Sequence, residues 1–364
     1  MALDARGIVV KTDRRTVALM AAIVILCGLG VTRAPAAEPP SPEIVSAWRE
    51  LFKRAPEPVA PVDNVATPEK IALGAQLFSD RRLSRHGERS CIDCHRPERA
   101  YTDGRRRARG LSGRPLPRNT PSLFNLAWGK QFFWDGRAAS LEEQVQGPIL
   151  AADEMGGDWP TILDRLKRDA GLAARFSRAY PGEPAISEAT VVKALASYVR
   201  SLVSPPNRFD AWVGGNPDAL SPSELRGFGL FVGKAGCVLC HVGWRFTDDH
   251  LHDIGLRSAD PGQGGVAGGT PGLRAFKTPG LRELARTAPY MHDGSLPTLT
   301  SVLAHYTGRF VPRPSLAINM KRDLRLEQGE RADLIAFLRA LSSTKNPASR
   351  TREAGRIMQR ARVP

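Results

Sequence analysis

The sequence predicts a mainly α-helical protein built from two similar domains. The first observation is an order of elements that occurs twice: an amphipathic helix pattern, a Cys-x-x-Cys-His pentad, loops and a closing helix pattern. The second is the scarcity of alternating apolar and polar runs, which would indicate strands. The third is a content of 34 glycines and 29 prolines, which favours long loops between the helices.

Each predicted domain begins with a helix whose start carries capping signals. Thr67-Pro68 places an N-cap residue before a proline in the first turn, and Ser221 and Glu224 form a capping-box pattern. The apolar faces of these helices are Ile71, Ala75 and Phe78, and Leu225, Phe228 and Phe231. Closing helices are expected over residues 187–203 and about 329–342, from apolar residues at helical spacing.

The two pentads, Cys91–His95 and Cys237–His241, contain the residues needed to attach a haem covalently. Two thiols three positions apart can form thioethers with the two vinyl groups of one porphyrin, and the adjacent histidine can bind the iron. A redox-active thiol pair or half of a zinc site is the alternative for one pentad. Two pentads favour two c-type haems. The attachment residues are then Cys91, Cys94 and His95, and Cys237, Cys240 and His241.

Residues 1–37 have the composition of a secretory signal peptide. A basic start precedes an apolar stretch over residues 16–31, which is shorter than a membrane span of ~20 residues. Ala34-Pro35-Ala36 predicts cleavage after Ala36 or Ala37. An uncleaved anchor is the alternative. We therefore expect a periplasmic location and no stable membrane span in the mature form.

The rest of the chain divides at changes in composition. Residues 38–65 are rich in proline and predict a linker, in which Ile44, Trp48 and Leu51 favour a short helix docked on the body or, alternatively, lying on a membrane surface. The N-terminal domain is predicted over residues 66–205 and the C-terminal domain over residues 206–345. Residues 346–364 are expected to form a basic tail.

The chain is strongly basic, with a formal net charge of +15. One cluster comprises Arg105, Arg106, Arg107 and Arg109. Such a surface would steer an acidic protein partner toward it, although a solvated segment is the simpler interpretation of the basic tail. Export argues against nucleic acid as a partner.

Further motifs accompany the pentads. They are Leu77-Phe78, Arg118-Asn119-Thr120-Pro121, Phe133-Trp134-Asp135-Gly136-Arg137-Ala138, Gln144-x-x-Gly147-Pro148, Glu154-Met155-Gly156, Lys277-Thr278-Pro279-x-Leu281-Arg282, and Ala288-Pro289-Tyr290-Met291-His292-Asp293-Gly294. With them, the stretch from about residue 67 to 342 resembles the bacterial di-haem cytochrome c peroxidase and MauG family. The resemblance implies a peroxide-dependent oxidoreductase. The haem of His95 would meet hydrogen peroxide, and that of His241 would relay or store an oxidising equivalent.

The resemblance also implies roles for individual side chains. Gln144 and Glu154 match the family's pair in the pocket of the N-terminal haem, where a carboxyl group can move a proton between the peroxide oxygens. Trp134 matches the tryptophan between the haems, which can carry an oxidising equivalent across the gap. A core aromatic residue that packs both domains is the alternative for Trp134.

A calcium site between the domains is implied as well. Asn119 and the backbone carbonyls of Thr287 and Pro289 match its ligands, and oxygen ligands suit calcium. An asparagine that caps a turn is the competing interpretation of Asn119.

Two departures from the peroxidase pattern favour the MauG type. The loop between His95 and Trp134 contains no histidine, so nothing in it would cap the N-terminal haem, and we expect that haem to react with peroxide in its ferric state. Fourteen residues after His292, where the peroxidases have methionine, this chain has Tyr306. A tyrosine oxygen as sixth ligand of the C-terminal haem would lower its reduction potential. The competing ligands are Met291 and Met320.

The sequence therefore predicts an enzyme that uses hydrogen peroxide to form a high-valent, bis-Fe(IV)-like state. It then oxidises a residue of a partner protein, typically tryptophan. The alternative is a di-haem peroxidase that reduces peroxide to water with electrons from a small cytochrome or cupredoxin. A pure electron-transfer cytochrome would not need Gln144 or Glu154. Trp244 is either an exit for the oxidising equivalent or an aromatic packed at the haem.

Overall fold

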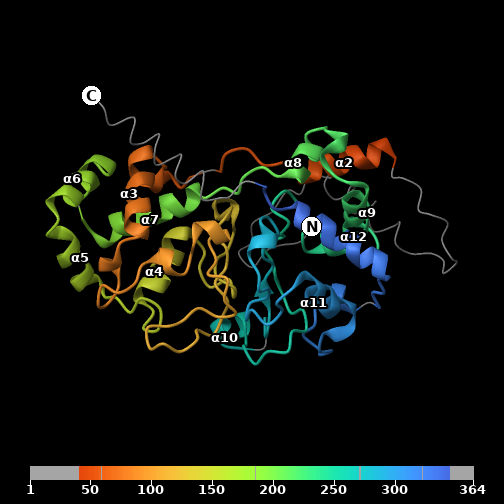
Figure 1. Ribbon diagram of the computed structural model, residues 1–364. Coiled ribbons are helices and arrows are strands. Elements are labelled where there is room, and N and C mark those ends of the chain that lie inside the picture. Colours follow the sequence, from red (N-terminus) through yellow and green to blue (C-terminus); the bar gives the residue numbers. More distant parts are fainter. Residues whose placement is uncertain (1–40, 59, 185, 270–271, 322, 345–364) are drawn as a thin grey trace, which may run out of the picture.

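The protein consists of two helical lobes that lie side by side (Figure 1). The computed structural model describes residues 41–58, 60–184, 186–269, 272–321 and 323–344, so the predicted signal peptide and basic tail lie outside the described residues. The strands in this part of the chain are β1 (Leu251–His252) and β2 (Phe276–Lys277), which pair in antiparallel fashion. None of the helices within the described ranges is long and apolar enough to cross a bilayer.

The N-terminal lobe is built around two crossing helices that the sequence predicted, α3 (Pro68–Phe78) and α7 (Glu188–Ser201). The capping signals are confirmed, because the Thr67 side chain accepts a hydrogen bond from the backbone of Lys70. The other helices are α4 (Leu141–Leu150), α5 (Trp159–Lys167) and α6 (Ala170–Ala179). Their apolar faces meet in a core that runs from Leu73 to Leu202.

The C-terminal lobe repeats this plan with α9 (Pro222–Val232) and α12 (Gln328–Ala340) as the crossing pair. The predicted capping box at Ser221 and Glu224 is present. The remaining helices are α8 (Arg208–Val213), α10 (Gln263–Ala267) and α11 (Leu299–Ala304), and α11 runs into a π-helical turn over His305–Arg309. The lobe's core is rich in phenylalanine, with Phe209, Phe228, Phe231, Phe246 and Phe337 all buried.

Helix α2 (Pro42–Phe52) docks on the C-terminal lobe beside α8, although the chain then continues into the N-terminal lobe (Figure 1). Trp48 packs edge-on against Phe228 with ring centroids 5.2 Å apart, and the fully buried Phe52 stacks on Phe246 at 5.0 Å. The apolar spacing in the proline-rich segment therefore marks a docked helix. The burial of Phe52 therefore fixes α2 on the C-terminal lobe, which is formed by residues far along the chain.

A second repeated unit lies between the helices and joins the lobes. One copy runs from Asn119-Thr120-Pro121 to Trp134-Asp135-Gly136, and the other from Lys277-Thr278-Pro279 to His292-Asp293-Gly294, with the same spacing. Each copy contains a 3-10 turn after a left-handed residue, at Leu126–Trp128 and Leu284–Arg286. The two segments therefore share one backbone conformation.

The two copies bind each other through main-chain hydrogen bonds. The N–H of Asn119 donates to the carbonyl of His292 at 2.7 Å, and the N–H of the equivalent Lys277 donates to the carbonyl of Trp134 at 2.7 Å. Arg118 strengthens the junction by donating to both carboxylate oxygens of Asp260, at 2.7 and 2.9 Å. This reciprocal pattern is that of a two-fold interface, formed here between the halves of one chain.

Both crossing helix pairs meet at a glycine. A Cβ added at Gly74 on α3 would lie 2.0 Å from the carbonyl oxygen of Ala194 on α7. A Cβ added at Gly227 on α9 would lie 2.0 Å from the carbonyl oxygen of Asp333 on α12. The two backbones thus approach more closely than any side chain would permit.

Gly227→Ala should lower the free energy of unfolding by about 1–3 kcal/mol, because the methyl group must push α9 and α12 apart. The matched control is Gly229→Ala on the same helix, where a Cβ meets nothing within 4 Å. That change should be neutral or stabilise the helix by up to about 1 kcal/mol. Denaturant unfolding of the haem-loaded protein measures both, and equal effects of the two variants would contradict the close crossing.

Candidate haem sites

The two pentads fold into the same closed turn. Cys91–Asp93 and Cys237–Leu239 are 3-10 turns, and the N–H of each pentad histidine returns to the carbonyl of the first cysteine, at 2.8 Å for His95 and 2.9 Å for His241. All four thiols are free of disulfides. Both pentads therefore have the local form and the reduced thiols that covalent haem attachment requires.

Each pentad histidine is oriented by a backbone carbonyl. The Nδ1 atom of His95 lies 2.8 Å from the carbonyl of Tyr101, and that of His241 lies 2.8 Å from the carbonyl of Phe246. Tyr101 and Phe246 both have left-handed backbones, which turn these carbonyls toward the rings. Burial lowers the pKa of both histidines. A neutral ring that donates from Nδ1 leaves Nε2 free to bind iron.

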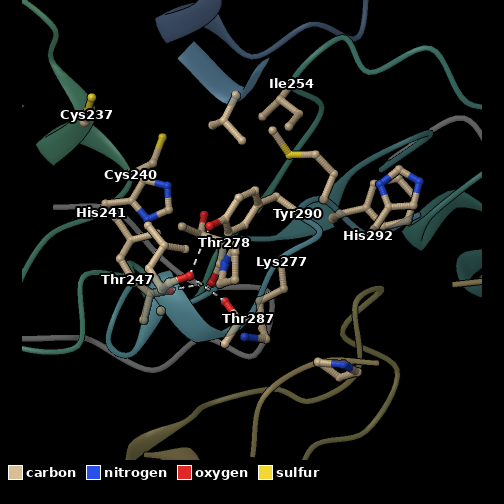
Figure 2. A pocket seen from close by; sticks show the side chains of 18 of the residues that line it. Cys237, Cys240, His241, Thr247, Ile254, Lys277, Thr278, Thr287, Tyr290 and His292 are labelled. Carbon is tan, nitrogen blue, oxygen red and sulfur yellow. Dashed lines mark hydrogen bonds between the residues drawn. The ribbon is translucent and has the colours of Figure 1, made fainter. Parts of the chain in front are cut away.

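A cavity of about 320 Å³ lies between the lobes, with a mainly apolar lining. Trp134 and Gln144 line it from one lobe, and His241 and Tyr306 from the other. Figure 2 shows Cys240 and His241 on one side of it, with Tyr290 and His292 across from them. A mainly apolar cavity bordered by Cys240 and His241 fits a covalently attached porphyrin at the second pentad.

Tyr306 lies in the π-helical turn that follows α11, and its side chain lines the cavity. Burial raises the pKa of its hydroxyl, and the nearby Cys237 and Cys240 add to this effect. Tyr306 therefore lies close to the pentad that would carry the C-terminal haem. The adjacent His305 points elsewhere, since its Nε2 lies 2.9 Å from the carbonyl of Ile254. The two competing methionines, Met291 and Met320, also line the cavity.

Gln144 and Glu154 lie on successive elements of the N-terminal lobe. Gln144 is in α4 and lines the cavity, whereas Glu154 is in the turn after α4 and is not among the lining residues. Burial raises the pKa of Glu154, and the charge of Arg137 partly offsets this. Burial also raises the pKa of Cys91 to about 12, with Glu154 among the charges that add to it. Glu154 is therefore an electrostatic neighbour of the first pentad.

Trp134 and Asn119 are joined at the junction of the lobes. The indole N–H of Trp134 donates to the carbonyl of Asn119 at 2.9 Å. The side-chain amide of Asn119 donates to the carbonyl of Arg105 at 2.8 Å, which leaves its Oδ1 atom available. Asn119, Thr287 and Pro289 all line the cavity, so the three residues of the expected calcium site face one space.

Trp244 is held between two cations. The guanidinium groups of Arg54 and Arg282 lie 5.0 and 5.2 Å from its ring centroid, and the ring of Trp128 meets it edge-on at 4.7 Å. Both guanidinium groups also form ion pairs with Asp210, so their charge is partly neutralised. Of the two interpretations of Trp244, its burial among these groups favours the packed aromatic over the exit.

The position of Lys277 in the cavity and the repeated joining unit were not predicted from the sequence. Lys277 stands in one of the quoted motifs without an assigned role, and the two copies of the joining unit share only Thr-Pro-x-Leu, Leu-Ala and Asp-Gly. The signal that could have revealed the repeat is the constant spacing between these short matches.

These features define a class: a mainly helical protein of two cytochrome c-like domains, with two pentads that fit c-type haems. Residues 68–218 match a family model described as di-haem cytochrome c peroxidase. The methylamine utilization protein MauG of Methylorubrum extorquens AM1 is 45% identical over 334 residues, covering 89% of this chain and 94% of that protein. The chain belongs to the di-haem cytochrome c peroxidase and MauG family, whose members are oxidoreductases that use hydrogen peroxide.

Two other relatives show the range of this family. The cytochrome c peroxidase IdrP1 of Denitromonas iodatirespirans is 34% identical over 325 residues, covering 80% of this chain and 85% of that protein. A crystal structure of a MauG-like protein associated with microbial copper homeostasis has a TM-score of 0.74 and 32% identity, covering 87% of this chain and 98% of that one. The predicted family and fold class are thus confirmed.

Proposed function

We propose that this protein is a periplasmic enzyme that uses hydrogen peroxide to oxidise a tryptophan residue of a partner protein. Peroxide gains two electrons and two protons to become two water molecules, and the partner residue supplies the two electrons. The bound haems supply the redox chemistry. The observation that carries the proposal is the position of Tyr306, a half-buried side chain that lines the cavity near Cys237 and Cys240.

The repeat accounts for why only the C-terminal haem would have a tyrosine ligand. At the spacing that relates Asn119 to Lys277, the position equivalent to Tyr306 is Pro148 in α4. Proline has no side-chain atom that could bind iron. One haem would therefore be closed by a tyrosine, while the other keeps an open face for peroxide. Tyr306 would lose its proton on binding ferric iron, and an anionic oxygen at the closed haem would favour its more oxidised states.

Glu154 and Gln144 would serve the open face. Peroxide must lose a proton from one oxygen and gain one on the other before the O–O bond breaks, and a carboxyl group can move that proton. The raised pKa of Glu154, caused by burial, lets this carboxyl hold a proton at a higher pH than usual. The amide of Gln144 would hold peroxide or water by hydrogen bonds.

Trp134 would carry the oxidising equivalent between the haems. It lines the cavity at the junction, and its main-chain carbonyl and indole N–H are both fixed by hydrogen bonds, to Lys277 and Asn119. A calcium ion bound by Asn119 Oδ1 and the carbonyls of Thr287 and Pro289 would stabilise the same junction.

The partner would be a protein with an acidic face, because this chain is strongly basic. The relatives come from methylamine utilization and from copper homeostasis, so a protein of one of these systems is the natural candidate. A small electron-donor protein would take its place if the enzyme were a simple peroxidase.

The proposal is tested by adding peroxide to the fully ferric, haem-loaded protein without any electron donor. We expect an immediate reaction and a long-lived near-infrared absorption band that reports charge shared between the haems, because no histidine lies in the loop between His95 and Trp134. A protein that reacts with peroxide only after one-electron reduction would be a peroxidase of the activated kind, and the proposal would fail.

Glu154→Gln should slow formation of that band by about 100-fold or more, the usual contribution of a proton-transferring group. Stopped-flow spectroscopy measures the rate. The matched control is Asp153→Asn, since Asp153 is the exposed neighbour of Glu154 in the same turn. Equal rates in the wild type and in Glu154→Gln would remove Glu154 from the mechanism.

A further inference from the structure

Lys277 places an ammonium group inside the cavity between the lobes. It is the last residue of β2, and its half-buried side chain lines the cavity. Figure 2 shows it beside Thr278 and Thr287, on the side of the cavity away from Cys237. Within the described residues the structure records neither an ion pair nor a hydrogen bond for its Nζ atom.

The acidic groups nearest to Lys277 already have partners. Asp249 is buried and forms an ion pair with Arg245. Asp248 accepts from His252 at 2.8 Å, and this bond raises the pKa of His252. Two cations thus neutralise two carboxylates, and Lys277 is the remaining positive charge in this group.

An ammonium group on the wall of a mainly apolar cavity is costly without a counter-ion, because it loses part of its hydration. Burial indeed lowers the pKa of Lys277, with Asp249 opposing that change. The cost disappears if a carboxylate enters the cavity beside Nζ. The group expected at His241, a c-type haem, carries two propionate carboxylates, and Asp248, Asp249 and Arg245 all belong to the loop that follows His241.

The equivalent position in the other half has no charge. Asn119 corresponds to Lys277 in the repeat, and its amide donates to the carbonyls of Arg105 and Arg106. The ammonium group therefore distinguishes the C-terminal half from the N-terminal half at a position where their backbones are equivalent.

We propose that Lys277 binds a propionate of the C-terminal haem and thereby sets the reduction potential of that haem relative to the other. The main-chain bond from Lys277 to Trp134 fixes the lysine at the junction of the lobes. A positive charge beside a haem favours the reduced iron, which has one positive charge less. Lys277 thus opposes the effect of an anionic sixth ligand and limits how far the potential of this haem can fall.

The test is to compare Lys277→Met with Lys277→Arg in the haem-loaded protein, without peroxide or partner. Lys277→Met should shift the one-electron reduction equilibrium of the C-terminal haem at least tenfold toward the ferric form, which is about 59 mV. It should also shift the propionate bending band in the resonance Raman spectrum. Lys277→Arg, which keeps the charge, should stay close to the wild type. Lys167→Met removes an exposed lysine of α5 and serves as the control for net charge.

The proposal is overturned if Lys277→Met leaves both the propionate band and the C-terminal potential unchanged while both haems are attached. A shift confined to the N-terminal haem, or a potential that depends on the buffer anion, would assign the ammonium group to another carboxylate or to a free anion. Lys277→Gln provides a second neutral variant if Lys277→Met does not fold. None of these readouts requires oxidation of a partner, so they are independent of the proposed function.

Discussion

The reciprocal exchange of main-chain hydrogen bonds between the two lobes is the constraint on which the rest of the structure depends. Asn119 binds the carbonyl of His292, and Lys277 binds the carbonyl of Trp134, each at 2.7 Å. Main-chain bonds do not depend on side-chain identity, so the junction can keep its geometry while its side chains differ. The cavity and both pentads are positioned around this junction.

The proposed chemistry depends on side chains that differ between the two halves of this junction. Equivalent positions hold Trp134 and His292, Asn119 and Lys277, and Pro148 and Tyr306. His292 stacks on Phe276 with ring centroids 3.5 Å apart, whereas Trp134 donates to a carbonyl. At each of these positions, the two halves have the same backbone location but side chains of different chemistry. Two similar haem sites can thereby become an open one and a closed one.

Much of this fold could be predicted from the sequence, because caps, helical periodicity and the pentads are local signals. The helices that begin after Thr67 and Ser221 are present. The docking of α2 on the distant lobe could not be predicted, since Phe52 finds its partners only through tertiary packing. The sequence also could not show that the ammonium group of Lys277 lacks a carboxylate partner within the described residues. This follows from the folded structure, in which Asp248 and Asp249 pair with His252 and Arg245.

The central claim is that Tyr306 closes one haem while the other stays open. Electron paramagnetic resonance of the resting ferric protein tests it most directly. We predict one high-spin and one six-coordinate low-spin signal in the wild type. Tyr306→Phe should lose the low-spin signal. The control is Tyr290→Phe, which should keep it, because the hydroxyl of Tyr290 already donates to the carbonyl of Leu284 at 3.2 Å. Two low-spin signals in the wild type, or an unchanged spectrum of Tyr306→Phe with both haems attached, would contradict the account.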